Sequence, residues 1–82
     1  MISCQFALYP LGVQDLSPAI AACLEEMRAM GLELEVGPMS TQVTGDSGLV
    51  FEGLKRAFDA AAADGRVVMT VTVSNACPVS PA

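Results

Sequence analysis

Few side chains in this chain could perform chemistry. The sequence contains no histidine, three cysteines and nine Asp or Glu residues. Histidine is the usual general base near neutral pH, and a cysteine nucleophile needs a base beside it. Cys4, Cys23 and Cys77 are widely spaced and form no CxxC pair, so neither a disulfide framework nor a zinc site is indicated. We therefore expect no catalytic residues, no metal site and no cofactor.

Two further features can be interpreted as either structural or functional. Cys4 and Cys23 fall on core-facing positions, where packing is the favoured role, and Cys77 lies in a tail before a proline. The stretch Gly45-Asp46-Ser47-Gly48 precedes a helix pattern and could bind an anion at the helix N-terminus. A turn with an N-cap explains the same residues, and we favour that interpretation.

The remaining sequence predicts four strands. Residues 2–9 alternate apolar and polar side chains, with Pro10 expected to end the strand. Residues 32–36 and 40–44 form shorter strand patterns, and residues 66–74 form the strongest one. In this last strand, Val67, Met69, Val71 and Val73 are expected to face the core.

Two helices are predicted between the strands. In the first, Ser17 is the expected N-cap, Pro18 is the first helical residue and Gly31 ends the helix. In the second, Asp46 or Ser47 is the expected N-cap. Its apolar stripe contains Val50, Phe51, Leu54, Ala57, Phe58 and Ala61.

The resulting order, β-α-β-β-α-β, predicts a ferredoxin-like α+β fold, with a four-stranded antiparallel sheet and two helices on one face. We expect one domain over residues 1–78 and a tail over residues 79–82. The uncovered sheet face would hold uncharged polar residues such as Gln5, Thr70 and Thr72. That face is either solvated or an interface with another sheet.

The same topology predicts a cluster at one end of the core. In this fold the end of the first strand lies beside the starts of the third and fourth strands, which brings Leu8, Thr41 and Met69 together. The start of the first helix, with Asp15 and Ser17, is expected there too. Apolar walls, a hydroxyl and a carboxylate suit a small, flat, partly polar ligand. An ordinary end of the core is the alternative.

Four stretches give the sequence a family resemblance. CQFALYP, STQVTGD, VFEGLKRAF and VVMTVTVSNACP resemble the YkoF-like family of thiamine- and hydroxymethylpyrimidine-binding proteins, in the same order and at compatible spacing from about Ser3 to Ser80. The resemblance implies binding of thiamine through its pyrimidine part, no enzymatic activity, and a role in uptake or salvage. It assigns ligand contacts to Leu8 and Thr41. Tyr9, Ser40 and Met69 follow as neighbours in those motifs.

Some members of this family have two such domains in tandem, whereas this chain has one copy. The resemblance therefore implies that two chains associate in place of the tandem pair, giving a homodimer or a homotetramer. A domain of 82 residues is also small enough for self-association to help stabilise it.

Charge and hydropathy exclude other classes of protein. The net charge is −5 with four Lys or Arg residues, too few for a nucleic-acid partner. No apolar run is long enough to insert into a membrane, and no signal peptide is recognised. Because the cysteines indicate no disulfide framework, we expect a protein of the reducing cytoplasm. The leading hypothesis is a binding protein for thiamine or hydroxymethylpyrimidine. The alternatives are a structural or regulatory oligomerisation module without such a ligand and, least favoured, a small enzyme.

Overall fold

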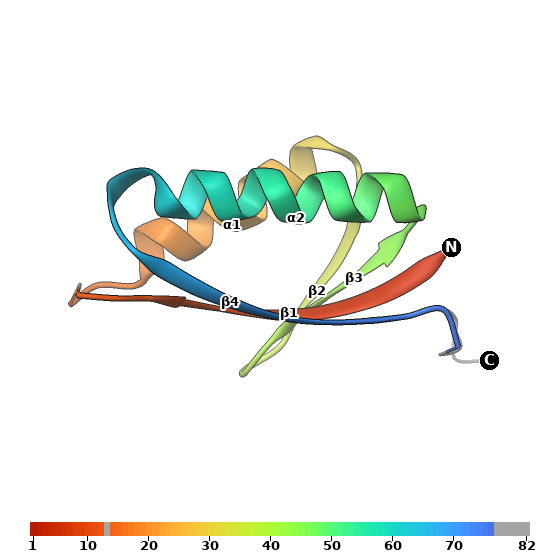
Figure 1. Cartoon of the computed structure of the whole chain (residues 1–82), viewed down its shortest axis with the longest axis horizontal. Coiled ribbons are helices and arrows are strands. Elements are labelled where there is room, and N and C mark those ends of the chain that lie inside the picture. The colour runs from red at the N-terminus through yellow and green to blue at the C-terminus, as the bar shows by residue number, and fades with distance from the viewer. Residues whose placement is uncertain (13, 77–82) are drawn as a thin grey trace.

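The computed structural model describes residues 1–12 and 14–76. The four strands form one antiparallel sheet in the order β2-β3-β1-β4. Both helices lie on one side of it (Figure 1), so the predicted ferredoxin-like fold is confirmed. The predictions for Cys77 and the tail lie outside the described residues. The elements are β1 (Ile2–Pro10), α1 (Ser17–Ala29), β2 (Glu33–Val36), β3 (Thr41–Gly45), α2 (Ser47–Ala61), the 3-10 turn η1 (Ala62–Asp64) and β4 (Val67–Ser74).

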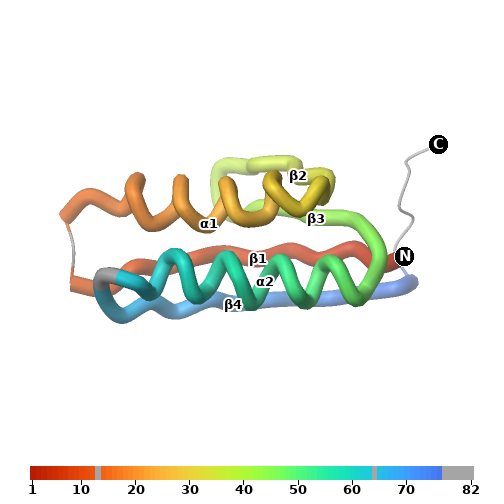
Figure 2. The backbone as a smooth tube through the Cα atoms, turned by 90° about the horizontal axis from the view of Figure 1, so that it is seen from above, coloured from red at the N-terminus to blue at the C-terminus, as the bar shows by residue number. Residues whose placement is uncertain are grey.

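The register of the strands places one apolar row under the helices. Cys4 lies opposite Val43 on β3 and Val73 on β4, and residues directly opposite each other share a face of the sheet. Cys4 and Val43 are buried, together with Met27 of α1 and Val50 of α2. The core therefore lies between the sheet and the paired helices, which run side by side above it (Figure 2).

The other face of the sheet holds the polar row. Gln5 lies opposite Gln42 on β3 and opposite Thr72 on β4, and no helix covers these residues in the described structure (Figure 1). The predicted uncharged open face is therefore present, with Glu33 and Glu35 of β2 at one side of it.

Helix α1 begins one residue earlier than expected. Ser17 is already helical and Leu16 is the N-cap, with no side-chain capping bond, so the predicted Ser17 cap is wrong. Instead Asp15 Oδ1 accepts a hydrogen bond from the Ser17 N–H at 3.0 Å, which satisfies one of the free donors of the first turn. Gly31 ends the helix as predicted: its φ of 78° suits glycine, and its N–H donates to the Arg28 carbonyl.

Helix α2 begins at the predicted cap, where the Asp46 carboxylate accepts a hydrogen bond from the Gly48 N–H at 3.0 Å. Its buried positions include Gly53, where an added Cβ would lie 2.7 Å from Leu32 Cδ1. The two predicted stripe positions Phe51 and Phe58 are exposed. The predicted stripe was too wide because the layer below covers only part of the helix.

Strand β4 lies at the edge of the sheet, beside β1 only. Val71 and Val73 share the helix-facing side with Phe6 and Cys4, as predicted. They are nevertheless 42% and 38% exposed, because no further strand covers their outer side. Among the described residues, no helix has the length and hydropathy needed to cross a membrane.

Candidate functional site

A gap in the sheet forms the candidate site. Strand β3 begins at Thr41, opposite Phe6, whereas β1 continues to Pro10 and pairs there with β4 alone. The β2–β3 hairpin turns tightly just before, with the Gly37 N–H donating to the Ser40 carbonyl at 2.9 Å. Its tip points away from the helices (Figure 1). In the described structure, residues 7–10 of β1 therefore have no neighbouring strand on the side away from β4.

A cavity of about 260 Å³ occupies this gap. We call it the Leu8–Thr41 cavity. The end of β1 forms one wall, α1 forms a second wall and the β2–β3 hairpin forms a third. Its lining residues are Phe6, Ala7, Leu8, Tyr9, Leu16, Ile20, Cys23, Leu24, Val36, Gly37, Pro38, Met39, Ser40 and Thr41.

The structure brings four of the five predicted ligand contacts to this cavity: Leu8, Tyr9, Ser40 and Thr41. Met69 lies directly opposite Leu8 on β4, as the topology predicted, but it packs against the core and does not line the cavity. Met69 does not reach the cavity because β1 lies between β4 and the gap.

Thr41 offers a hydroxyl group to the cavity. It is the one buried polar or charged residue of the described chain. No side-chain hydrogen bond among the described residues involves it, yet no fully buried polar side-chain atom there lacks a partner. The Thr41 oxygen is therefore not sealed off, and a ligand in the cavity could donate to it or accept from it.

Tyr9 is exposed at the end of the paired strands and also borders the cavity. It lies opposite Val68 and is 51% exposed, so most of the ring is not held in the core. At the same time it lines the cavity at the end of the paired strands. An aromatic ring at the mouth of a cavity can cover one face of a flat ligand.

Cys23 is a cavity residue that the sequence assigned to core packing. It is buried on α1 and lines the Leu8–Thr41 cavity. Burial raises the pKa of the Cys23 thiol to about 11 and also raises the pKa of Cys4. Both thiols are therefore neutral near pH 7. Ile20 lies three residues before Cys23, so the two side chains share a face of α1. This spacing in the sequence could have identified the helix wall of the cavity.

The chemistry available in the cavity is limited to packing and hydrogen bonding. None of its lining residues is charged. Within residues 1–12 and 14–76, no cluster of three His, Cys, Asp or Glu side chains could hold a metal ion. Such a cavity can enclose an aromatic ring and bond its edge, but it offers no side chain suited to general acid–base work at neutral pH.

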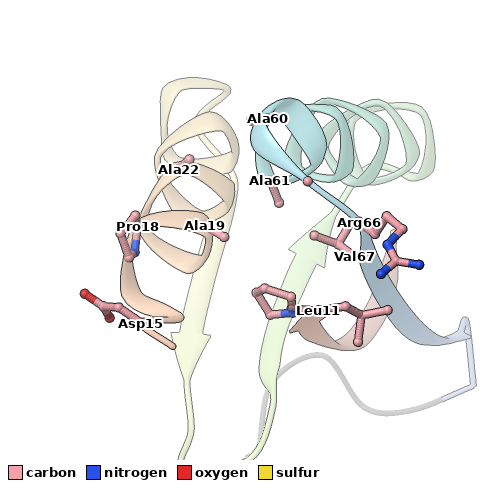
Figure 3. A pocket seen from close by; sticks show the side chains of 11 residues that line it. Leu11, Asp15, Pro18, Ala19, Ala22, Ala60, Ala61, Arg66 and Val67 are labelled. Carbon is pink, nitrogen blue, oxygen red and sulfur yellow. The ribbon is translucent and has the colours of Figure 1, made fainter. Parts of the chain in front are cut away.

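A second cavity, of about 220 Å³, lies between the ends of the two helices. We call it the Ala19–Ala61 cavity, after the two alanines that approach it from α1 and α2. Val67 also points into this space, whereas the charged ends of Asp15 and Arg66 point away from it on opposite sides (Figure 3). Asp15 was expected beside Leu8 and Thr41, but the structure places it at this second cavity.

Comparison with solved structures identifies the same fold in proteins of low sequence identity. A domain of unknown function from Bacillus cereus matches with a TM-score of 0.79 and 22% identity, over 89% of this chain and 73% of that one. A protein from Streptococcus pneumoniae matches with a TM-score of 0.82 and 21% identity, over 95% and 88%.

A third structure, from Thermotoga maritima, has been provisionally named a thiamine biosynthesis/salvage protein. It matches with a TM-score of 0.76 and 23% identity, over 88% of this chain and 80% of that one. No match was found among curated proteins. The model of the YkoF-related family matches residues 1–80, nearly the whole sequence, and this chain therefore belongs to the YkoF-related family.

Proposed function

We propose that this chain is a non-enzymatic, cytoplasmic binding protein for thiamine or its hydroxymethylpyrimidine moiety, and that it acts in uptake or salvage of the vitamin. The observation that supports this most directly is the Leu8–Thr41 cavity. Four residues assigned to ligand binding by motif resemblance line one cavity that contains no charged side chain.

The chemistry of an aminopyrimidine matches the walls of this cavity. Its two faces are apolar and aromatic, and Leu8 and Ile20 offer apolar contact. Its edge has an amino donor and ring-nitrogen acceptors, for which the Thr41 and Ser40 hydroxyls are suitable partners. Residues 7–10 of β1 offer a second set of partners, because alternate backbone groups on their open side have no strand beside them.

Charge supports the orientation in which the pyrimidine enters first. A cationic thiazolium would lose hydration in an uncharged cavity without gaining an ion pair. Left at the mouth, it stays in water and within the field of a chain with net charge −5. We therefore propose that the pyrimidine is bound inside and that the thiazolium stays at the mouth, near Tyr9 and Met39, both of which are exposed.

The comparisons support a thiamine-related role at a coarser level. The family match covers residues 1–80, and one structural neighbour has a name that refers to thiamine biosynthesis or salvage. We further propose that the chain works as a homodimer or homotetramer, in which the open polar face around Gln5, Gln42 and Thr72 meets a second sheet.

Titration calorimetry can test the binding proposal with four ligands: thiamine, thiamine phosphate, hydroxymethylpyrimidine and the isolated thiazole. We expect saturable heat with the three ligands that contain the pyrimidine and none with the thiazole. An absence of heat with all four at millimolar concentration would contradict the proposal.

A structural or regulatory oligomerisation module is the second candidate. The uncharged open face favours it, since such a face can pack on another sheet without burying charge. This candidate predicts a stable oligomer whose unfolding temperature does not change in the presence of thiamine or hydroxymethylpyrimidine.

A further inference from the structure

The charged residues beside the walls of the Leu8–Thr41 cavity are acidic. No described residue that lines the cavity is charged. Of the residues directly before or after a lining residue, three are charged, and they are Asp15, Glu25 and Glu35. All three are exposed. The segments that form the walls therefore favour an approaching cation and repel an anion.

Three of the four Lys and Arg residues of the chain lie in other parts of the fold. Lys55 and Arg56 are on α2, which contributes no lining residue to this cavity. Each forms an ion pair with an acidic residue of the same helix, with an N–O distance of 3.0 Å. Arg66 lines the other cavity, and its charged end points away from that space (Figure 3).

Arg28 is the fourth basic residue. It follows Leu24, the last residue of α1 that lines the Leu8–Thr41 cavity, by about one helical turn. It belongs to the last turn of α1, where a cation interacts favourably with the partial negative charge of the helix end. This position beyond the lining residues gives Arg28 a role at the helix end, without contact with a bound ligand.

The start of α1 is poorly suited to bind phosphate. Backbone N–H groups at a helix start can bind phosphate when they are free. Here the Ser17 N–H donates to the Asp15 carboxylate at 3.0 Å, and Pro18 has no N–H. The Ile20 N–H donates to the Leu16 carbonyl at 3.2 Å. The helix start therefore holds a carboxylate of the chain itself, which would repel a second anion.

Given the proposed function, on which this step rests, we infer that the site selects the unphosphorylated ligands, thiamine and hydroxymethylpyrimidine, against their phosphate esters. A phosphate monoester has a charge of about −1.5 to −2 at pH 7. Its strong partners in proteins are Arg and Lys, and the cavity offers hydroxyl groups in their place. Loss of hydration without an ion pair opposes binding of the ester.

The two phosphate esters differ in where they place the charge. In hydroxymethylpyrimidine phosphate, the phosphate is attached one carbon from the ring that we propose is bound inside the cavity. We expect this ester to bind about 100-fold more weakly than hydroxymethylpyrimidine, because the phosphate loses hydration. In thiamine phosphate, the group extends from the thiazolium at the mouth. We expect a loss of about fivefold there, which should shrink in about 0.5 M NaCl because salt screens exposed charges.

Titration calorimetry of the full chain with the two parent compounds and their two esters tests this selectivity. We expect the order of losses just given. An ester that bound as tightly as its parent compound would overturn the inference and leave the proposed function standing. An absence of binding by both parent compounds would instead overturn the proposed function, and the inference with it.

A pair of charge-matched variants tests whether the missing cation is the cause. Met39 lines the cavity and is 87% exposed, whereas Leu49 is exposed in the first turn of α2 and does not line it. Met39→Lys should shift the ratio of thiamine phosphate to thiamine affinity about tenfold in favour of the ester. Leu49→Lys adds the same charge and should leave this ratio within about twofold. Equal shifts in both variants would contradict a local cause.

Arg28→Gln tests the one basic residue on a helix that lines the cavity. The variant removes the cation and keeps a polar side chain at the end of α1. We expect both ester-to-parent affinity ratios to remain within about twofold of wild type. A further tenfold loss of ester affinity would show that Arg28 already serves as a phosphate partner, and would overturn the inference.

Discussion

The two cavities lie on opposite flanks of the same helix, yet they differ in what they can bind. The Leu8–Thr41 cavity combines apolar walls with two hydroxyls, a phenol and a neutral thiol. The lining of the Ala19–Ala61 cavity includes four alanines and no hydroxyl side chain, and its charged residues are directed outward (Figure 3). Cavities of similar volume therefore need not be similar sites.

Their origins explain the difference. The Leu8–Thr41 cavity exists because β3 begins opposite Phe6 while β1 continues to Pro10, which leaves backbone groups and loop hydroxyls beside an opening. The Ala19–Ala61 cavity lies where short side chains of α1 and α2 face each other, beside the end of β1 and the start of β4. The first cavity therefore has hydroxyl side chains and an unpaired stretch of strand in its wall, whereas no hydroxyl side chain lines the second.

The largest effect on ligand affinity is expected from filling the Leu8–Thr41 cavity, with the Ala19–Ala61 cavity as the comparison. Ile20 and Ala22 lie two residues apart on α1 and line different cavities. Ile20→Trp should block the Leu8–Thr41 cavity and weaken thiamine binding about 100-fold, or about 2.7 kcal/mol. Calorimetry with thiamine measures this change.

Ala22→Leu is the matched control, because it adds bulk to the Ala19–Ala61 cavity from the same helix. We expect it to leave thiamine affinity within twofold of wild type. If Ala22→Leu abolished binding while Ile20→Trp did not, the roles assigned to the two cavities would be reversed.

A smaller effect is expected when one hydroxyl is removed. Thr41→Val keeps the shape of the side chain but deletes the hydroxyl group that we propose contacts the ligand. A hydrogen bond of this kind is worth about 1 kcal/mol, so hydroxymethylpyrimidine should bind five- to tenfold more weakly by calorimetry. Thr44→Val, at a half-buried position on the same strand, is the control. Equal affinities for Thr41→Val and wild type would remove Thr41 from the site.

The Cys23 thiol lines only the Leu8–Thr41 cavity, and its ionisation makes the stability of the chain depend on pH. Burial raises its pKa from 9.0 to about 11. The folded state thus favours the neutral thiol, and this contribution to stability is present below pH 9 and is lost as pH rises toward 11. Between pH 8 and pH 10 the free energy of unfolding should fall by about 1 kcal/mol on account of Cys23.

Urea unfolding of wild type and Cys23→Ala at the two pH values isolates this contribution. The variant will be less stable at both values because it leaves a void, but its loss between pH 8 and pH 10 should be smaller. The raised pKa of Cys4 contributes equally to both proteins. Identical losses would show that Cys23 ionises as freely in the folded state as in the unfolded one.

The smallest effect is expected at Asp15, which lines the Ala19–Ala61 cavity and accepts a hydrogen bond from the Ser17 N–H. Asp15→Asn keeps an oxygen acceptor and removes one charge. We expect less than a twofold change in the ratio of thiamine to hydroxymethylpyrimidine affinity. A tenfold loss for thiamine alone would place this carboxylate beside the thiazolium.

Much of the fold could be predicted from local patterns. The alternation in residues 2–9 identified the core-facing row, and Asp46 and Gly31 marked helix ends through their own backbone chemistry. The first N-cap was predicted wrongly, because Asp15 satisfies the Ser17 N–H from outside the helix. Local sequence favours a cap, but it does not decide which neighbouring oxygen supplies the bond.

The site was less predictable than the fold, since cavities depend on where elements end relative to one another. The topology brought Leu8 and Thr41 together, yet it could not show that β1 would separate Met69 from the opening. Similarly, the helical pattern of Phe51 and Phe58 indicates an apolar surface without indicating what covers it. Tertiary contacts decide whether such a surface is buried. The helical repeat of apolar residues alone does not distinguish an exposed surface from the core.

A crystal structure of the chain with hydroxymethylpyrimidine tests the central claim most directly. We expect the ring in the Leu8–Thr41 cavity, with its edge bonded to Thr41 or to the open backbone of residues 7–10 and with its faces against Leu8 and Ile20. A ligand bound in the Ala19–Ala61 cavity, or a Leu8–Thr41 cavity closed by its own side chains at saturating ligand, would contradict it.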